Sequence, residues 1–320
     1  MRPSASMRET YGRTLAELGE EHPEIVVLDA DLSTSTHTSL FARKFPERFF
    51  NVGVAEANLM GVAAGLASCG KLPFVSTFSV FATEKGLSQF KQSIAYPNLN
   101  VKVVVTHGGL SVGEDGASHF CLWDLAVMRS LPRTTVIVPA DAVETEEAVR
   151  ALVDHRGPAF LRLPRAKTGL VYGEGYTYRG EKLEFRIGES VVLEEGEDAT
   201  VLAIGPLVVE ALEASEALRK EGLRVGVIDV HTLKPLDEKT ILREASRTGC
   251  LVTAEDHSII GGLGGAVAEL LAERRPTPMK RVGVRDEFGK SGPWRELYEA
   301  YGLTSRHIQQ AVREVREMVR

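Results

Sequence analysis

A single carboxylate and a polar, glycine-rich loop carry most of the chemical potential of this chain. Within FFNVGVAEANLMGVAAGLASCG (49–70), Glu56 is the only charged side chain. It would either offset a helix macrodipole from the first turn or favour its protonated form among apolar neighbours and share that proton with a bound base. This stretch alone leaves both interpretations open.

The loop THGGLSVGEDGASH (106–119) follows a strand-like run and combines several reactive groups. It contains His107 and His119, an adjacent Glu114–Asp115 pair, and four glycines that let the backbone approach a ligand closely. A plain turn is the alternative, because Asp before Gly is a turn signal. The glycine spacing matches neither a phosphate loop nor a dinucleotide fingerprint.

A pair of aromatic residues stands where another strand-like run turns into a helix. STFSVFATE (76–84) places Phe78 and Phe81 three residues apart. Core packing is the default for such a pair, and a shelf for a flat heterocycle is the alternative.

Short β-branched runs, separated by helix-length segments, must position these residues. In the first part of the chain the runs are 25–31, 73–78, 101–107, 134–141 and 159–164. Because they are apolar on both faces, they predict a mostly parallel sheet with helices on both sides. Ligands of such sheets bind beyond the carboxyl ends of the strands, and the candidate residues follow those ends.

The alternating pattern dissolves between about 166 and 187, in a stretch rich in glycine and charge. We therefore expect a first domain over 1–170, a linker over 171–187 and a second α/β domain over 188–320. The second set of runs is 199–205, 224–230, 249–256 and 280–287, followed by an amphipathic helix over 305–319. A glycine cluster at 258–272 misses the dinucleotide fingerprint and favours close helix-to-sheet packing.

The composition narrows the class of protein. The 320 residues are 43% hydrophobic and 26% charged, which is enough for two soluble domains. A net charge of -6 argues against a nucleic-acid binder. Cys69, Cys121 and Cys250 are far apart and indicate neither a disulfide framework nor a zinc site. Without a signal peptide or an 18-residue apolar run, we expect a cytoplasmic protein with no membrane partner.

In their order and spacing, the motifs resemble those of the C-terminal half of the transketolase family, over nearly the whole chain. DADLSTS, VGVAEANL, STFSVF and THGGLSVGEDGASH are similar to the family's A-D-L, G-x-x-E, S-T-F-x-x-F and H-x₅-G-E-D-G-x-x-H segments. FLRLPRAK and EFGKSGPWRELYEAYGLT match two more. The resemblance implies a pyrimidine-binding domain followed by the family's C-terminal domain.

The resemblance also implies a cofactor, thiamine diphosphate. Glu56 would bond a pyrimidine ring nitrogen and donate a proton there, Phe78 and Phe81 would provide dryness and stacking, and Asp31 would lie near the thiazolium. The family often has an aromatic residue three positions after the second phenylalanine. Here that residue is Glu84, so the chain departs from the family at the outer edge of the cofactor pocket.

The substrate implied by the resemblance is a phosphorylated sugar. Arg8, Ser35, His107 and Arg165 correspond to the family's sugar-phosphate site, and guanidinium groups suit phosphate oxygens. Asp115 would face a sugar hydroxyl and His119 the ketose end. The implied reaction is transfer of a two-carbon ketol unit between sugar phosphates, with His107 and His119 acting beside Glu56.

One family motif has no counterpart here, namely the G-D-G…N segment that holds magnesium and the diphosphate. We therefore expect a split enzyme, in which an N-terminal transketolase subunit binds the diphosphate and Mg²⁺. This chain would be the β component of an α₂β₂ assembly and would self-associate at its core.

Three alternatives share parts of this pattern. The β subunit of a 2-oxoacid dehydrogenase has the same fold and split arrangement, although GEDGASH with Arg8, Ser35 and Arg165 favours a sugar phosphate. A 1-deoxyxylulose 5-phosphate synthase-like activity uses nearly the same groups, but that enzyme is usually one chain. A non-catalytic stabilising partner would not need the intact set of Glu56, His107, Asp115 and His119.

Overall fold

The first of two large sheets has seven strands in the order β14-β6-β7-β5-β4-β2-β3. The computed structural model describes residues 3–319. The strands of this sheet are β2 (Ile25–Asp29), β3 (Phe49–Asn51), β4 (Leu72–Phe78), β5 (Lys102–Thr106), β6 (Thr135–Ile137), β7 (Ala159–Arg162) and β14 (Thr232–Lys234). All pair in parallel except β14, which is antiparallel to β6.

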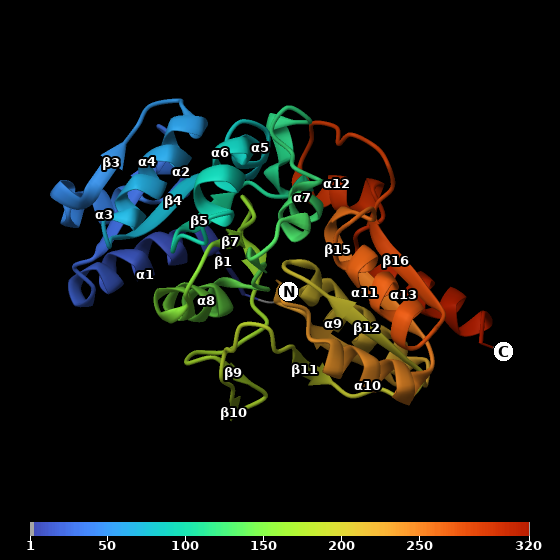
Figure 1. The fold of residues 1–320 in the computed structure, drawn as a ribbon. Helices are drawn as coiled ribbons and strands as arrows, with labels where there is room; N and C mark the ends of the chain where they lie inside the picture. The colour runs from blue at the N-terminus through green and yellow to red at the C-terminus, as the bar shows by residue number, and fades with distance from the viewer. Residues whose placement is uncertain (1–2, 320) are drawn as a thin grey trace.

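Helices cover both faces of this sheet (Figure 1). Alternate residues of β2 point to opposite sides, so Ile25 and Val27 pack with α1 (Met7–Glu21) and α8 (Ala142–Asp154). Val26 and Leu28 pack with α4 (Glu56–Ser68) and α7 (Asp124–Ser130) on the other side. The prediction of a mostly parallel sheet buried on both faces is confirmed.

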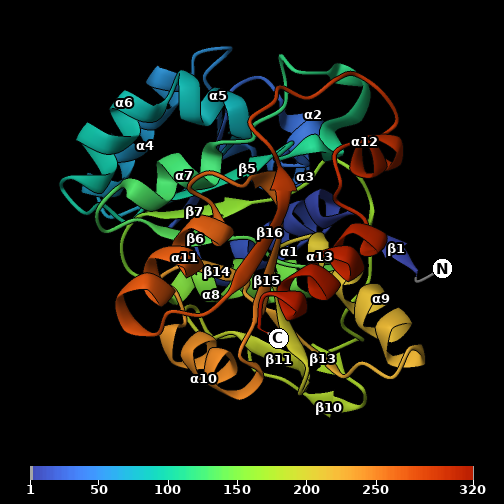
Figure 2. The ribbon, with the colours of Figure 1, turned by 90° about the vertical axis from the view of Figure 1, so that its right-hand side faces the viewer.

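The second sheet has five strands in the order β11-β13-β12-β15-β16. They are β11 (Val191–Glu194), β12 (Ala199–Ala203), β13 (Val225–Asp229), β15 (Leu251–Ser258) and β16 (Met279–Val284), and β11 alone is antiparallel. Its helices are α9 (Leu207–Lys220), α10 (Glu238–Thr248), α11 (Leu263–Arg274) and α13 (Ser305–Glu317). Figure 2 shows α9 and α13 side by side over this sheet. The chain is thus a two-domain α/β protein, as predicted.

The glycines at the start of α11 allow close packing of this helix on its sheet. A Cβ at Gly264 would lie 2.7 Å from the Arg281 side chain and 2.9 Å from that of Thr253, on neighbouring strands. The prediction of close helix-to-sheet packing for this cluster is therefore confirmed at Gly264.

The two domains share one apolar core. Val136 and Val138 of the first domain belong to the same cluster as Leu202, Ile228 and Leu233 of the second. Strand β14 also leaves the second half of the chain to extend the first sheet, with Thr232 opposite Ile137. The sequence pattern did not indicate this exchange, because a three-residue strand has no measurable period.

Residues 171–187 are packed against both domains. Tyr172 and Tyr176 are buried; the Tyr172 hydroxyl donates to Asp229 at 2.7 Å, and the Tyr176 hydroxyl donates to Glu144 at 2.8 Å. The segment also forms a small antiparallel pair of β9 (Thr177–Tyr178) and β10 (Glu181–Lys182). A stretch that reads as a polar connection therefore joins the domains through buried polar contacts.

The remaining elements are short. They are β1 (Ser4–Ala5), α2 (Ser33–Thr36), α3 (Ser39–Lys44), η1 (Pro46–Arg48), α5 (Ser79–Glu84), α6 (Leu87–Gln89), η2 (Phe90–Ala95), η3 (Leu110–Asp115), β8 (Thr168–Gly169) and α12 (Trp294–Ala300). Across residues 3–319, none of the helices has both the length and the apolar content that crossing a bilayer requires.

Candidate active site

The predicted site residues gather along the carboxyl edge of the first sheet. Arg165 follows β7, His107 follows β5, Phe78 ends β4, Ser35 follows β2 and Glu56 follows β3. These five strands are neighbours in the order β7-β5-β4-β2-β3 and all run in parallel. At a strand spacing of about 4.8 Å, the edge extends over roughly 19 Å. Such an edge can hold an elongated ligand.

Glu56 is the first residue of α4 and is only 3% exposed. Within residues 3–319, no hydrogen bond or ion pair joins its carboxylate to another group. The first-turn position suits a negative charge near a helix N-terminus. That position alone does not explain the burial, since burying an unpaired carboxylate is costly. The arrangement leaves a carboxyl group free to pair with a ligand.

Phe78 and Phe81 form an aromatic cluster with two histidines. The two phenyl rings are nearly parallel, with centroids 5.6 Å apart, and His107 stacks on Phe78 at 3.6 Å. His119 meets the edge of Phe81 at 5.7 Å. Phe78 is buried and Phe81 is half-buried. The cluster therefore packs in the core at Phe78 and reaches partly to the surface at Phe81.

His107 has a left-handed backbone conformation and a strongly lowered pKa. Its backbone has φ 61°, in the left-handed region, and its Nδ1 is 2.8 Å from the hydroxyl of Thr106. Burial, followed by the nearby charges of Arg8 and Arg165, lowers the pKa of His107 to about 2. The ring is therefore neutral at pH 7, with Nε2 available for another partner.

Arg8 from α1 reaches the same edge and forms a cationic cluster with Arg165. Its Nη1 donates to the Ser35 carbonyl at 2.5 Å, and its Nη2 donates to the Arg165 carbonyl at 2.9 Å. Its Nε is buried without a partner. Burial and the charge of Arg165 lower the pKa of Arg8, and burial and Arg8 lower the pKa of His37. His37 was missed by the sequence interpretation.

Arg165 connects this cluster to the loop at 106–119. Its Nη1 donates to the Val112 carbonyl at 3.1 Å and to Glu114 at 3.3 Å, while its Nε lies 3.9 Å from the Asp115 carboxylate. The side chains of Arg165 and Asp115 are both 39% exposed. Asp115 therefore faces solvent beside the cationic cluster, where a ligand hydroxyl can reach it.

Asp31 is exposed and has a left-handed backbone with φ 66°. Its carboxylate accepts from the Asn51 side chain at 2.9 Å, and its amide donates back to the Asn51 side chain at 3.1 Å. Asn51 thus couples the ends of β2 and β3 directly before the turn into α4. Sequence reasoning missed Asn51, for which the only signal was a polar residue at a strand end.

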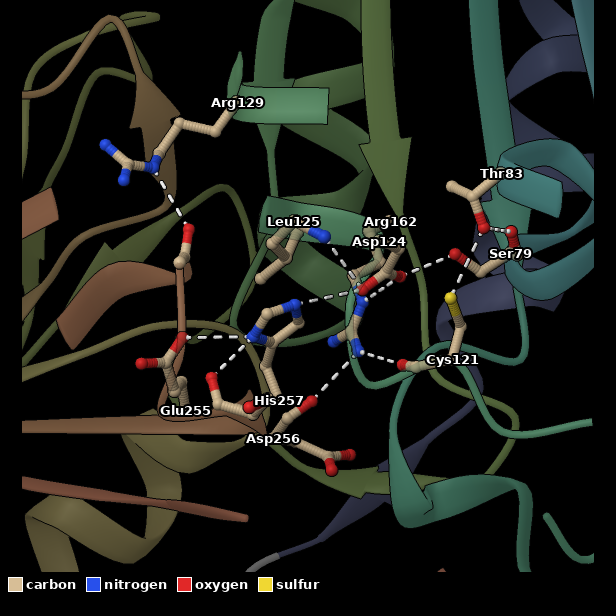
Figure 3. A network of polar contacts seen from close by, with 12 residues as sticks. Ser79, Thr83, Cys121, Asp124, Leu125, Arg129, Arg162, Glu255, Asp256 and His257 are labelled. Atoms are coloured by element: carbon tan, nitrogen blue, oxygen red, sulfur yellow. Dashed lines mark hydrogen bonds and ion pairs between the residues drawn. The ribbon is translucent and has the colours of Figure 1, made fainter. Parts of the chain in front are cut away.

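A buried ion pair lies behind the site (Figure 3). The Arg162 Nε is 2.7 Å from Asp124, whose carboxylate also accepts from Ser79 at 2.5 Å. A second Arg162 nitrogen donates to the Asp256 carbonyl at 2.9 Å. Sequence reasoning missed these residues too, although an arginine inside the apolar run FLRLP was a visible signal.

Comparison with known proteins finds two domain families in order along the chain. Residues 3–169 match the family described as transketolase, pyrimidine binding domain, and residues 188–308 match transketolase, C-terminal domain.

Three of the similar proteins match this chain along nearly their whole length. A putative transketolase C-terminal section from Methanocaldococcus jannaschii is 46% identical over 309 residues, which are 96% of this chain and 95% of that protein. The 6-deoxy-6-sulfo-D-fructose transketolase subunit SqwH from Clostridium sp. is 42% identical, covering 97% of this chain and 94% of that protein. A solved structure described as a split gene transketolase, inactive beta4 tetramer, superposes with a TM-score of 0.90 at 48% identity and covers 98% and 99% of the two chains.

Proposed function

The chain belongs to the transketolase family and corresponds to its C-terminal half, and we propose that it is the C-terminal subunit of a split transketolase. In this proposal it transfers a two-carbon ketol unit from a ketose phosphate to an aldose phosphate, using thiamine diphosphate. The observation that carries the proposal is the burial of the Glu56 carboxylate. Within residues 3–319 this carboxylate has no hydrogen-bond or ion-pair partner. It lies on the same sheet edge as the aromatic shelf, formed by Phe78 and Phe81, and the cationic cluster, formed by Arg8 and Arg165.

The residues on this edge fit the cofactor. When bound, thiamine diphosphate supplies the carbon nucleophile that accepts the two-carbon unit. Glu56 would share a proton with a pyrimidine ring nitrogen, because a carboxyl group within hydrogen-bond reach of a basic nitrogen can act as a general acid. Phe78 and Phe81 would stack against the ring, and Asp31 would stand at the neighbouring strand end.

The outer edge of the shelf is polar in this chain. Glu84 is exposed at the end of α5, and the Lys85 ammonium lies 4.6 Å above the centre of the Phe81 ring. The cation covers a ring face in the region where the family often has an aromatic residue. We propose that Lys85 takes over part of that covering role.

We expect Phe81→Leu to weaken thiamine diphosphate binding by the reconstituted complex about three- to tenfold. The reason is that aromatic pairing contributes roughly 0.5–1.5 kcal/mol beyond simple burial. Equilibrium titration with the cofactor in the presence of Mg²⁺ measures the change. The control is Phe45→Leu, which changes a half-buried phenylalanine next to α3. It is expected to leave the affinity for thiamine diphosphate unchanged. Equal effects of the two variants would contradict a stacking role.

The substrate would lie between the shelf and the cationic cluster. Arg8, with its unpartnered Nε, and Arg165 would bind the terminal phosphate together with Ser35. His107 is neutral and is held by Thr106, so its Nε2 can form a hydrogen bond with a sugar oxygen and orient it.

The opposite side of this proposed substrate site carries a carboxylate and a second imidazole. The Asp115 carboxylate would accept a hydrogen bond from a sugar hydroxyl, since it is exposed beside Arg165. His119 would contact the ketose end from the edge of the shelf. Together with His107 it would orient the sugar against the nucleophilic carbon of the cofactor.

We expect Arg8→Gln to raise the KM for a ketose phosphate about 10- to 100-fold with a small change in kcat. A hydrogen bond to a charged group contributes roughly 1.5–3 kcal/mol, and it acts on the phosphate rather than on the reacting carbons. Steady-state kinetics of the reconstituted complex tests this expectation. Arg13→Gln changes an exposed arginine on the same helix and should leave the KM unchanged. A lowered kcat at constant KM would contradict the assignment.

We propose that the diphosphate and Mg²⁺ are held by an N-terminal transketolase subunit in an α₂β₂ assembly. The similarity to a transketolase C-terminal section over 95% of that protein supports this division. A groove of about 340 Å³, lined by Trp123, Ile260 and Phe288 among others, lies next to the shelf, because Trp123 also packs against the Phe78 cluster. Phe288 is 76% exposed and Ile260 is 57% exposed, which suits a surface that a second subunit covers.

A second candidate differs only in the terminal anion of the substrate. The similarity to a 6-deoxy-6-sulfo-D-fructose transketolase subunit favours testing a sulfonate. Arg8 and Arg165 can bind a sulfonate as well as a phosphate, since both groups present three acceptor oxygens to guanidinium donors.

A donor panel tests the proposal. The chain is co-purified with an N-terminal transketolase subunit from the same genome and assayed with xylulose 5-phosphate, a 6-sulfo-ketose, and pyruvate. Turnover of xylulose 5-phosphate with an aldose phosphate acceptor supports the first candidate, and turnover of the sulfonate alone supports the second. Turnover of pyruvate or a branched oxoacid alone would overturn both in favour of a 2-oxoacid dehydrogenase.

Product analysis separates the remaining alternatives. Formation of 1-deoxyxylulose 5-phosphate from pyruvate and glyceraldehyde 3-phosphate would identify the synthase-like activity. A complex in which this chain can be replaced by its Glu56→Gln variant without loss of rate would indicate a stabilising partner.

A further inference from the structure

The loop 107–119 is seated on the C-terminal domain over most of its length. Gly109 is in the left-handed region at φ 77°, and a Cβ there would lie 2.2 Å from the Asp256 carboxylate. A Cβ at Gly108 would lie 2.5 Å from the Arg162 side chain. These two glycines therefore permit close approach to protein groups rather than to a ligand.

Asp256 bonds this loop directly from the second sheet. It lies near the end of β15 and is 2% exposed. Its Oδ1 accepts from the Leu110 backbone amide at 2.8 Å, and its Oδ2 accepts from the Tyr298 hydroxyl at 2.8 Å. Burial raises the pKa of Asp256, and the charge of Arg162 and the amides of Leu110 and Ser111 oppose this rise. One buried carboxylate thus fixes the chain immediately after His107.

The far side of the loop has a second contact with the same domain. The Ser291 hydroxyl donates to the Glu114 carbonyl at 2.5 Å. Cβ atoms at Gly113 and Gly116 would each lie 3.4 Å from the backbone or side chain of 291–292. The C-terminal domain therefore contacts the loop at two places, directly after His107 and next to Asp115.

These contacts help to hold the backbone and the ring of His107 in place. His107 has a left-handed backbone at φ 61°, a conformation that persists in a non-glycine residue only when the surroundings impose it. Its ring must also stay stacked on Phe78. Behind the loop, Arg162 is fixed by Asp124 and donates to the carbonyl of Asp256 itself (Figure 3).

We propose that Asp256 is a positioning residue of the active site, through which the C-terminal domain holds His107 and the loop 107–119 in the geometry that binds substrate. The catalytic consequence rests on the proposed function, because it assumes that His107 contacts the sugar. The structural consequence does not, since it concerns the loop of this chain alone.

Two measurements test the proposal with Asp256→Ala and the milder Asp256→Asn. Amide hydrogen exchange of Leu110 in the full chain is expected to accelerate about tenfold or more in Asp256→Ala, because its charge-assisted bond to the carboxylate is lost. In the complex, kcat/KM for the ketose donor is expected to fall roughly 10- to 100-fold, since small displacements of positioned groups are costly. Thiamine diphosphate affinity should stay within about twofold, because Asp256 bonds to Arg162 of β7, whereas Glu56 follows β3, three strands beyond the β5 strand that precedes His107.

Glu255→Gln is the matched control. Glu255 is also a buried carboxylate of β15, but it accepts from the Leu263 and Gly264 amides of α11 at 2.7 and 2.8 Å and does not touch the loop. It is expected to leave loop exchange unchanged and kcat/KM within about threefold of the parent. Asp256→Asn keeps an acceptor for Leu110 and should fall between the parent and Asp256→Ala, even if the alanine variant fails to fold.

The outcomes separate cleanly. Unchanged exchange at Leu110 in both Asp256 variants would overturn the proposal, whatever the activity. Faster exchange with unaltered kcat/KM in an active complex would also overturn it, because the loop would then not need this support. An inactive parent complex with faster exchange would instead contradict the proposed function and leave the role of Asp256 in ordering the loop supported.

Discussion

Glu56→Gln is expected to lower the kcat for ketol transfer by the reconstituted complex about 10²- to 10⁴-fold. General acid–base groups contribute rate factors of this size, and an amide cannot hand a proton to a ring nitrogen. Cofactor affinity should fall much less, because the phenyl shelf remains. Single-turnover kinetics with saturating thiamine diphosphate separates the two effects.

The same substitution should not harm the fold. Within residues 3–319 the Glu56 carboxylate bonds to nothing that the substitution would disrupt, and an amide is less costly to bury than an unpaired charge. We expect the unfolding temperature of the chain to stay unchanged or to rise. Glu24→Gln, directly before the amino end of β2 and therefore at the edge of the sheet away from the site, is the control and should leave kcat unchanged. A kcat for Glu56→Gln within threefold of the parent would contradict the proton-donor role.

The second large effect concerns stability. Asp124→Leu is expected to lower the free energy of unfolding of the chain by about 3–5 kcal/mol, because it leaves a buried guanidinium without its carboxylate. The Arg162 and Asp124 side chains are 4% and 0% exposed, and Ser79 would lose its acceptor as well. Equilibrium denaturation in urea, monitored by circular dichroism, measures the loss.

Two further variants show whether burial is the cause. Glu269→Gln breaks the Arg129–Glu269 pair, whose glutamate is 63% exposed, and should cost less than about 1 kcal/mol. Arg162→Met combined with Asp124→Leu removes both charges and should be more stable than Asp124→Leu alone. A double variant that is less stable than the single one would show that the unpaired arginine is not the source of the loss.

Much of the first domain could be predicted from local pattern. The runs at 25–31, 73–78 and 101–107 are apolar on both faces, and the observed strands β2, β4 and β5 lie within or next to them. Parallel pairing then brings their carboxyl ends to one edge, so residues far apart in sequence gather without any knowledge of their contacts. The gathering of Arg165, His107, Phe78 and Ser35 on one edge follows from this rule.

Local pattern could not reveal contacts between the two halves of the chain. Asp256 and Arg162 occupy strands that read as buried and apolar, and a charge there has meaning only once its partner from the other domain is known. Strand β14 could not be predicted from the sequence pattern either, because it has three residues and pairs with a strand about 95 positions earlier. Long-range pairing of this kind depends on the packing of both domains.

The ambiguity at Glu56 shows the same limit. Its place in the first turn of a helix could be predicted, but burial with no bonding group in residues 3–319 is a property of the folded chain. Only that combination favours a proton shared with a ligand over a simple interaction with the helix dipole. The loop glycines are a similar case, since Gly109 makes room for Asp256.

The most direct measurement is a crystal structure of this chain together with its N-terminal subunit, thiamine diphosphate and Mg²⁺. We expect a Glu56 carboxylate oxygen about 2.6–3.2 Å from a pyrimidine ring nitrogen, with the ring against Phe81 and the diphosphate on the other subunit. A pyrimidine ring bound elsewhere, with Glu56 turned into solvent or paired to another protein group, would show that Glu56 is not the proton donor to the cofactor.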